Sequence, residues 1–166
     1  MDVELTAHLG QRPPQLPPAD RFQANAMRKL MEMGERVAEA QNAAQINAAH
    51  LLASLGRVGD ADATALLEKH GLGPERIEAE LRRSQSAEDA LQVFVGKIGL
   101  SEGGTAALSQ AVEVAEEYGQ QQANYWHILL GLLLSGELSI LLTRLHEGRE
   151  GARLEVKEHL DKRKKK

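Results

Sequence analysis

The chain contains no cysteine, which excludes disulfide bonds, thiolate metal ligands and a cysteine nucleophile. A chain without cysteine is compatible with a reducing compartment, and we expect a cytoplasmic protein. The first ten residues, MDVELTAHLG, lack the basic and apolar regions of a secretory signal. The apolar run Ile128–Leu134 is only seven residues long. A membrane-spanning helix needs about 20 apolar residues, so we expect no membrane span.

Motifs for catalysis, phosphate binding and metal binding are also missing. The sequence has neither G-x-S-x-G nor H-E-x-x-H. The single Gly-Lys pair, Gly96-Lys97, is followed by Ile98, and Leu91 stands where a phosphate loop needs its first glycine. Neither His50 nor His127 has a second metal ligand four residues later. The sequence therefore predicts no enzymatic activity, no cofactor and no metal.

The composition is that of an ordinary globular protein. The 166 residues are enough for one domain, or for two small ones fused, and they can bury a core without disulfide bonds or bound metal ions. Hydrophobic residues make up 42% of the chain and charged residues 27%. A formal net charge of −4 gives no general attraction to nucleic acid or to anionic lipid.

Strong helix formers dominate after Asp20, and the alternation typical of strands is missing. Four of the five prolines lie within Pro13–Pro18, so we interpret Met1–Ala19 as an extended leader. We expect helices at Phe22–Ala43, from Asn47, near Asp62–His70, from Pro74, at Ser86–Val95, around Leu108–Tyr118, from Asn124, at Leu138–Leu145 and at Leu154–Leu160. In the first helix, the predicted buried stripe is Ala26, Leu30, Met33, Val37, Ala40 and Ala44.

The sequence repeats itself at an offset of 77 residues. The offset aligns Asn47 with Asn124, His50 with His127, Leu52 with Leu129, Gly59 with Gly136, Gly71 with Gly148 and Glu78 with Glu155. A constant offset over successive elements indicates an internally duplicated four-helix unit, so we expect an all-α, pseudo-twofold domain. The predicted boundaries are a leader at 1–19, repeat 1 at 20–84, a connecting segment at 85–99, repeat 2 at 100–160 and a basic tail at 161–166.

We assign structural roles to two pairs of polar residues that the 77-residue offset aligns. Asn47 and Asn124 precede predicted helices, where an asparagine side chain can cap the free N–H groups of the first turn. We expect His50 and His127 to pack at the same helix starts and to form local hydrogen bonds.

The doubled pattern resembles the repeat of the Clp N-terminal domain. The first copy reads I-x-x-x-H-L-L-x-x-L from Ile46 and then L-L-x-x-x-G-L-x-x-E-x-I from Leu66. The second copy is weaker and keeps His127, Ile128, Leu129, Leu132, Leu141, Leu142 and Leu154. The segment HGLGPERIEAEL is most similar to the ClpC branch of this family. The resemblance implies two four-helix repeats in a non-catalytic domain that receives adaptors and substrates for an AAA+ ATPase ring.

The chain departs from the family at the start of the second helix of each repeat. The family usually has Gly-Thr-Glu-His there, but this chain has Ala49 and Trp126 in place of the acid. In some ClpC-type domains that acid helps to bind phosphoarginine, and neither replacement can pair with a guanidinium group. Apolar protein binding is the alternative, with Ala48, Ala49, Tyr125 and Trp126 as candidate contacts. The sequence leaves open whether Trp126 lies in the core or on an exposed patch.

We therefore expect a protein-binding module, an accessory or adaptor whose partners are a Clp-type AAA+ ATPase or protease subunit, other adaptors, or substrate polypeptides. One alternative is the N-terminal fragment of a full-length Clp ATPase. Another is a regulatory protein that binds nucleic acid through its basic tail, Lys162–Lys166. Nucleic acid is not the expected partner, because no interleaved aromatics or second basic face accompany that tail.

Overall fold

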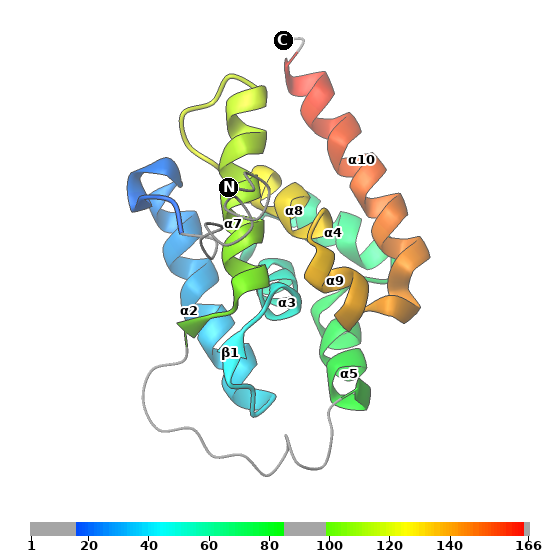
Figure 1. Cartoon of the computed structure of the whole chain (residues 1–166). Coiled ribbons are helices and arrows are strands. Elements are labelled where there is room, and N and C mark those ends of the chain that lie inside the picture. Colours follow the sequence, from blue (N-terminus) through cyan, green and yellow to red (C-terminus); the bar gives the residue numbers. More distant parts are fainter. Residues whose placement is uncertain (1–15, 85–98, 165–166) are drawn as a thin grey trace, which may run out of the picture.

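The computed structural model describes residues 16–84 and 99–164, and these form an all-α domain (Figure 1). This confirms the predicted fold class. The α-helices are α2 (Ala24–Ala40), α3 (Ala48–Val58), α4 (Ala61–Lys69), α5 (Pro74–Ser84), α7 (Glu102–Glu117), α8 (Tyr125–Leu133), α9 (Gly136–Leu141) and α10 (His146–Lys164). Two 3-10 turns, η1 (Ala19–Arg21) and η2 (Thr143–Leu145), and two short strands, β1 (Gln45–Ile46) and β2 (Gly99–Leu100), complete the described part.

The backbone follows the predicted pseudo-twofold pattern. Strand β1 of the first half pairs in parallel with β2, which opens the second half. The matching contact, at the offset of 77 residues, is the parallel bridge between Phe22 and Ala123. The segment before the first helix of each half therefore pairs with the segment before the second helix of the other half, and these pairings hold the two repeats together.

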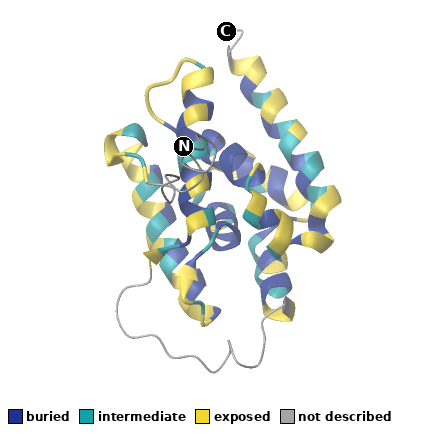
Figure 2. Cartoon of the chain, viewed as in Figure 1, coloured by how far each residue is buried: buried dark blue, intermediate teal, exposed yellow. Residues whose placement is uncertain are grey.

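Helices α3 and α8 form the centre of the core (Figure 2). Every residue from Ala48 to Leu55 and from Trp126 to Leu133 is buried. The run Ile128–Leu134 is thus a core helix apart from its last residue, Leu134, which is exposed. Within the described residues, no helix combines the length and the apolar character that crossing a bilayer requires.

The long amphipathic helices largely match their predicted stripes. In α2, Ala26, Leu30 and Val37 are buried as expected. Ala40 and Ala44 are exposed, contrary to prediction, because the helix ends at Ala40 and the chain then turns away.

The fourth helix of repeat 2 differs most from expectation, whereas that of repeat 1 begins at Pro74 as predicted. In repeat 1 the chain breaks at Gly71, which has a φ of 72°, and α5 begins at Pro74. The equivalent of Pro74 is Gly151, so nothing stops the helix there, and α10 begins at His146, ahead of the expected start at Leu154. Leu154 is 58% exposed, whereas its equivalent Ile77 is fully buried. Helix α10 also includes the first residues of the predicted basic tail, since it continues to Lys164.

Three predictions fall on parts of the chain outside the described residues. These are the helix at Ser86–Val95, most of the leader, and the last two residues of the tail. The repeat boundaries also stay predictions.

Candidate functional site

The starts of α3 and α8 carry the same polar arrangement, built from an asparagine and a histidine. The side-chain oxygen of Asn47 accepts the backbone N–H of His50 at 2.9 Å, and Nδ1 of His50 accepts the backbone N–H of Asn47 at 3.0 Å. In α8, Oδ1 of Asn124 accepts the N–H groups of Trp126 and His127 at 2.9 and 3.3 Å, and Nδ1 of His127 accepts the N–H of Asn124 at 3.0 Å. Each pair is a reciprocal capping box, in which the asparagine and the histidine satisfy each other's backbone N–H groups.

Burial keeps both capping histidines neutral near pH 7. Each is 2% exposed, and loss of hydration lowers the pKa of each ring to about 4. A hydrogen bond with the backbone of Gln45 partly offsets this for His50, whereas the charge of Arg163 lowers the pKa of His127 further. Because Nδ1 accepts a hydrogen bond in each ring, the ring proton of the neutral form lies on Nε2.

The candidate binding residues lie beside these caps, at different depths. Ala48 and Ala49 are fully buried in the core, so their side chains offer no surface in this conformation. Tyr125 is half-buried, and its hydroxyl pKa is raised by burial and by the carboxylate of Asp60. A binding role for these residues stays a prediction.

Trp126 is 5% exposed, which places it in the core cluster. One face of its indole stacks on His159 of α10, with ring centroids 3.7 Å apart and planes inclined by 15°. Burial lowers the pKa of His159, with a further contribution from Arg163, so the ring in this stack is neutral at pH 7. The indole therefore joins the core of repeat 2 to the outer helix α10.

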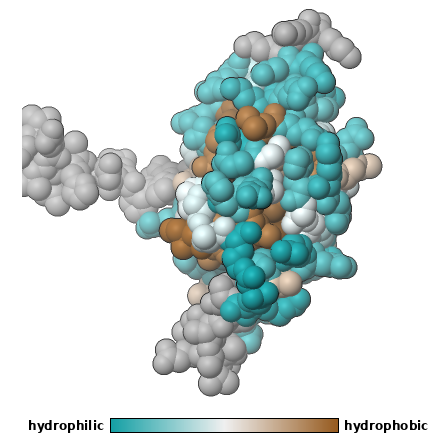
Figure 3. Space-filling view, turned by 90° about the vertical axis from the view of Figure 1, so that its right-hand side faces the viewer, coloured by the Kyte–Doolittle hydropathy of each residue, from teal (hydrophilic) through white to brown (hydrophobic). Residues whose placement is uncertain are grey.

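An open groove of about 530 Å³ lies between α4 and α10, above this stack. We call it the Trp126 groove. Figure 3 shows that hydrophilic side chains predominate on the face that carries α10 and that its hydrophobic areas are separate from one another. The groove is lined by Asp62, Ala65, Leu66, Lys69, Trp126, Glu155, Glu158, His159 and Lys162.

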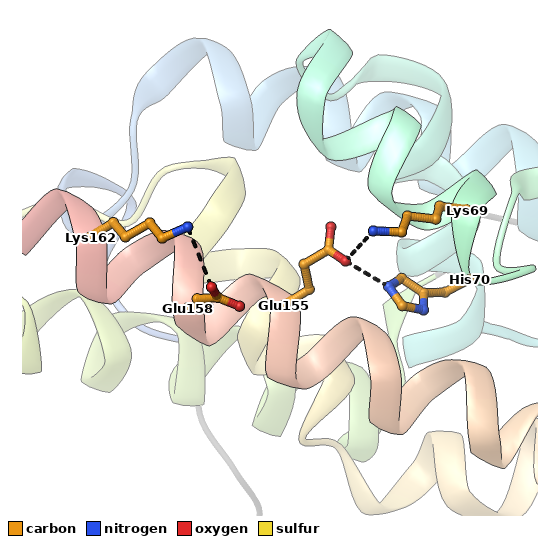
Figure 4. A network of polar contacts seen from close by, with 5 residues as sticks. All are labelled: Lys69, His70, Glu155, Glu158 and Lys162. Carbon is orange, nitrogen blue, oxygen red and sulfur yellow. Dashed lines mark hydrogen bonds and ion pairs between the residues drawn. The ribbon is translucent and has the colours of Figure 1, made fainter.

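Two ion pairs flank the groove, one between α4 and α10 and one within α10 (Figure 4). Oε1 of Glu155 on α10 accepts from Nζ of Lys69 at 2.8 Å and lies 3.1 Å from Nε2 of His70. These two bonds, the one from Lys69 first, lower the pKa of the Glu155 carboxyl. One turn further along α10, Lys162 pairs with Glu158 at 3.3 Å. The groove thus presents an apolar floor between walls that carry both signs of charge.

The sequence alone did not identify most of this groove. Trp126 was a candidate, but the partner ring of His159 and the charged walls were not. Their positions depend on how α10 lies across α4, and no local pattern encodes that placement. Among the described residues, no cluster of three or more histidine, cysteine, aspartate or glutamate side chains is arranged to hold a metal ion.

Solved structures match the fold of this chain at low sequence identity. No protein-family model matches the chain, and no curated protein sequence matches it. The solved N-terminal domain of the Clp-protease-associated chaperone ClpD from Arabidopsis thaliana superposes with a TM-score of 0.64 at 16% identity, covering 85% of this chain and 95% of that one.

Two further structures superpose almost as well. The Hsp104 N-terminal domain from Candida albicans gives a TM-score of 0.62 at 15% identity, covering 81% of this chain and 88% of that one. A structure from a study of a malarial protein secretion system gives a TM-score of 0.63 at 16% identity, covering 86% of this chain and 96% of that one. The chain has the fold of a Clp N-terminal domain. The resemblance inferred from the doubled motif is therefore confirmed at the level of the fold.

Proposed function

We propose that this chain is a non-catalytic protein-binding module that receives partner or substrate polypeptides for a Clp-type AAA+ chaperone or protease in the cytoplasm. The fold supports the assignment to Clp-type systems. The observation that carries the binding role is the Trp126 groove, an open channel with an aromatic floor on the outer face of the domain.

The chemistry of the groove suits an extended polypeptide segment. Leu66 and the Trp126 indole offer apolar contact at the floor, and aromatic side chains in such central positions often dominate binding energy. Lys69 and Lys162 can meet acidic groups on a ligand, whereas Asp62 can meet basic ones. Mixed charges around an apolar centre favour a peptide with both kinds of side chain over a uniformly charged polymer.

The experiment measures binding of the purified chain to the Clp-type ATPase and protease subunits of its source organism, by interferometry. Asp62→Lys and Lys69→Glu reverse charges on exposed wall positions, where the loss of one surface ion pair costs stability of only about 0–1 kcal/mol. We expect the double variant to weaken binding at least tenfold. The matched control, Lys29→Glu, reverses an exposed charge on α2 and should bind like the unaltered chain.

The single tryptophan supplies an independent readout, because Trp126 forms the floor of the groove. Its emission should shift when a partner fills the groove. No binding to any Clp subunit, or equal loss of binding in the α2 control, would contradict the proposal.

A further inference from the structure

The stacked ring of His159 carries a buried atom that has no partner. Its Nε2 is inaccessible to solvent and forms no hydrogen bond within the described part of the chain. The same ring lies against the Trp126 indole, with the centroids 3.7 Å apart, and it lines the Trp126 groove. A neutral imidazole can leave Nε2 without a proton, whereas a protonated ring has an N–H on both nitrogens. Protonation in the stack therefore creates a charged, buried donor without an acceptor.

Groups of both signs face this ring from the two helices that form the groove. Burial and then the charge of Arg163 lower the pKa of His159, the carboxylates of Asp60 and Asp62 oppose this shift, and Lys162 adds to it. Helix α8 contributes Trp126 to the groove and no charged side chain. The charged residues that line the groove are Asp62 and Lys69 from α4, and Glu155, Glu158 and Lys162 from α10.

Asp62 is the carboxylate that is available to a charged His159. It is exposed in the first turn of α4, and its side chain forms neither a hydrogen bond nor an ion pair within residues 16–84 and 99–164. The other carboxylates near the ring are already engaged. Asp60 caps α4 by accepting the N–H of Ala63, Glu155 holds Lys69 and His70, and Glu158 pairs with Lys162 (Figure 4).

We propose that protonation of His159 breaks its stack on Trp126 and transfers the ring to the carboxylate of Asp62, so that mild acid closes the Trp126 groove. The new ion pair joins α10 to α4 across the groove, and it gives the charged ring the acceptor that the stack does not provide. An imidazolium that stayed on the indole would keep a cation–π attraction, but it would leave a buried charged donor unpaired. This latch does not depend on which polypeptide the groove binds.

The test is NMR spectroscopy of the isotopically labelled full chain between pH 7 and pH 5, the range in which histidine is the natural switch. The shifts of the His159 ring nitrogens, assigned by comparison with His159→Gln, report its protonation. Nuclear Overhauser effects between this ring and the Trp126 indole report the stack. We expect these effects to disappear over the pH range in which the ring gains its proton, while the circular dichroism stays that of the folded chain.

Asp62→Asn tests the acceptor, because asparagine keeps the size of the side chain and removes its charge. We expect His159 to bind its proton about threefold more weakly in this variant, as for the loss of one exposed ion pair, and the protonated ring to stay on the indole. The matched control is Glu68→Gln, at an exposed α4 position outside the groove lining, which should titrate like the unaltered chain.

Four results would overturn the latch. They are a stack that persists in the protonated unaltered chain, an unchanged titration in Asp62→Asn, no protonation of His159 while the chain is folded, and loss of the stack only together with the circular dichroism signal. The last result would show unfolding in place of a local switch. None of these measurements includes a partner, so failure of the latch is distinguishable from failure of the binding function.

Discussion

At the scale of single residues, the two capping histidines make the stability of the domain depend on pH. Their folded-state pKa of about 4 lies below the ordinary value of 6.5, so the unfolded chain binds protons more readily. Stability is therefore complete above about pH 6.5 and falls as the pH drops toward 4. For each ring, we expect the free energy of unfolding to fall by about 2 kcal/mol between pH 7 and pH 5. A lower urea midpoint at pH 5 would measure this loss.

The matched variant for this prediction replaces both histidines by glutamine. A glutamine at the third helical position can still accept the N-cap N–H, but it does not titrate. His159 also has a lowered pKa, and it still contributes to the pH dependence of stability in this variant. The double variant should therefore lose much less stability between pH 7 and pH 5 than the unaltered chain. An equal loss in both proteins would show that the caps do not carry the pH dependence.

Trp126 gives a second prediction at this scale. Because the indole is buried and stacked, Trp126→Ala should reduce the free energy of unfolding by roughly 3–5 kcal/mol. His159→Ala removes only the stacking partner and should cost about 1 kcal/mol. Chemical denaturation followed by circular dichroism measures both. A loss below about 0.5 kcal/mol for Trp126→Ala would place the side chain on the surface instead.

At the scale of elements, the close approach of α7 and α8 depends on Gly131. A Cβ added to Gly131 would lie 2.6 Å from the carbonyl oxygen of Ala107 and 2.8 Å from the amide nitrogen of Ala111. These neighbours are backbone atoms, so the helices would have to separate. Gly131→Ala should therefore destabilise the protein by about 1–3 kcal/mol, although alanine is the better helix former. Gly136→Ala is the control, since a Cβ there meets nothing within 4 Å, and it should leave the thermal midpoint unchanged or higher.

Glu137 of α9 supports the start of α3 from the other half of the molecule. Its Oε1 accepts the backbone N–H of Ala48 at 2.8 Å and the hydroxyl of Ser101 at 3.0 Å. A carboxylate at a helix N-terminus stabilises the helix, because it accepts hydrogen bonds from free N–H groups and its negative charge opposes the helix dipole. Glu137→Ala should cost about 1–2 kcal/mol in urea denaturation, whereas Glu102→Ala, at an exposed position on α7, should cost less than half of that. Equal effects would contradict this role for Glu137.

At the scale of the whole molecule, the two repeats share one core and should unfold together. Helices α3 and α8 contact each other, and the two crossed pairings, β1 with β2 and Phe22 with Ala123, connect the halves. Tryptophan fluorescence reports on the surroundings of Trp126 in repeat 2, whereas far-ultraviolet circular dichroism reports on all helices. We expect both signals to change at the same urea concentration, as in a two-state transition. Separate midpoints would show that the repeats are independent folding units.

The sequence by itself determined the helices, their caps and the duplication. Asn47 and Asn124 were identifiable because capping chemistry is local, and α3 and α8 because their apolar runs are bounded by caps and glycines. The twofold relation followed from a constant offset, which needs no knowledge of distances. The same local reasoning failed at α10: it predicted a helix that begins at Leu154, whereas the helix begins at His146 and Leu154 is exposed.

Only the tertiary structure decided which residues meet across the two repeats. His159 lies 33 positions after Trp126, and Lys69 lies 86 positions before Glu155, so no local periodicity brings either pair together. The position of α10 across α4 and α8 forms the Trp126 groove, and it also buries the indole whose position the sequence left undecided. That position follows from the packing of side chains distant in sequence, whose free energy depends on their joint arrangement in space and not on any one segment of the chain.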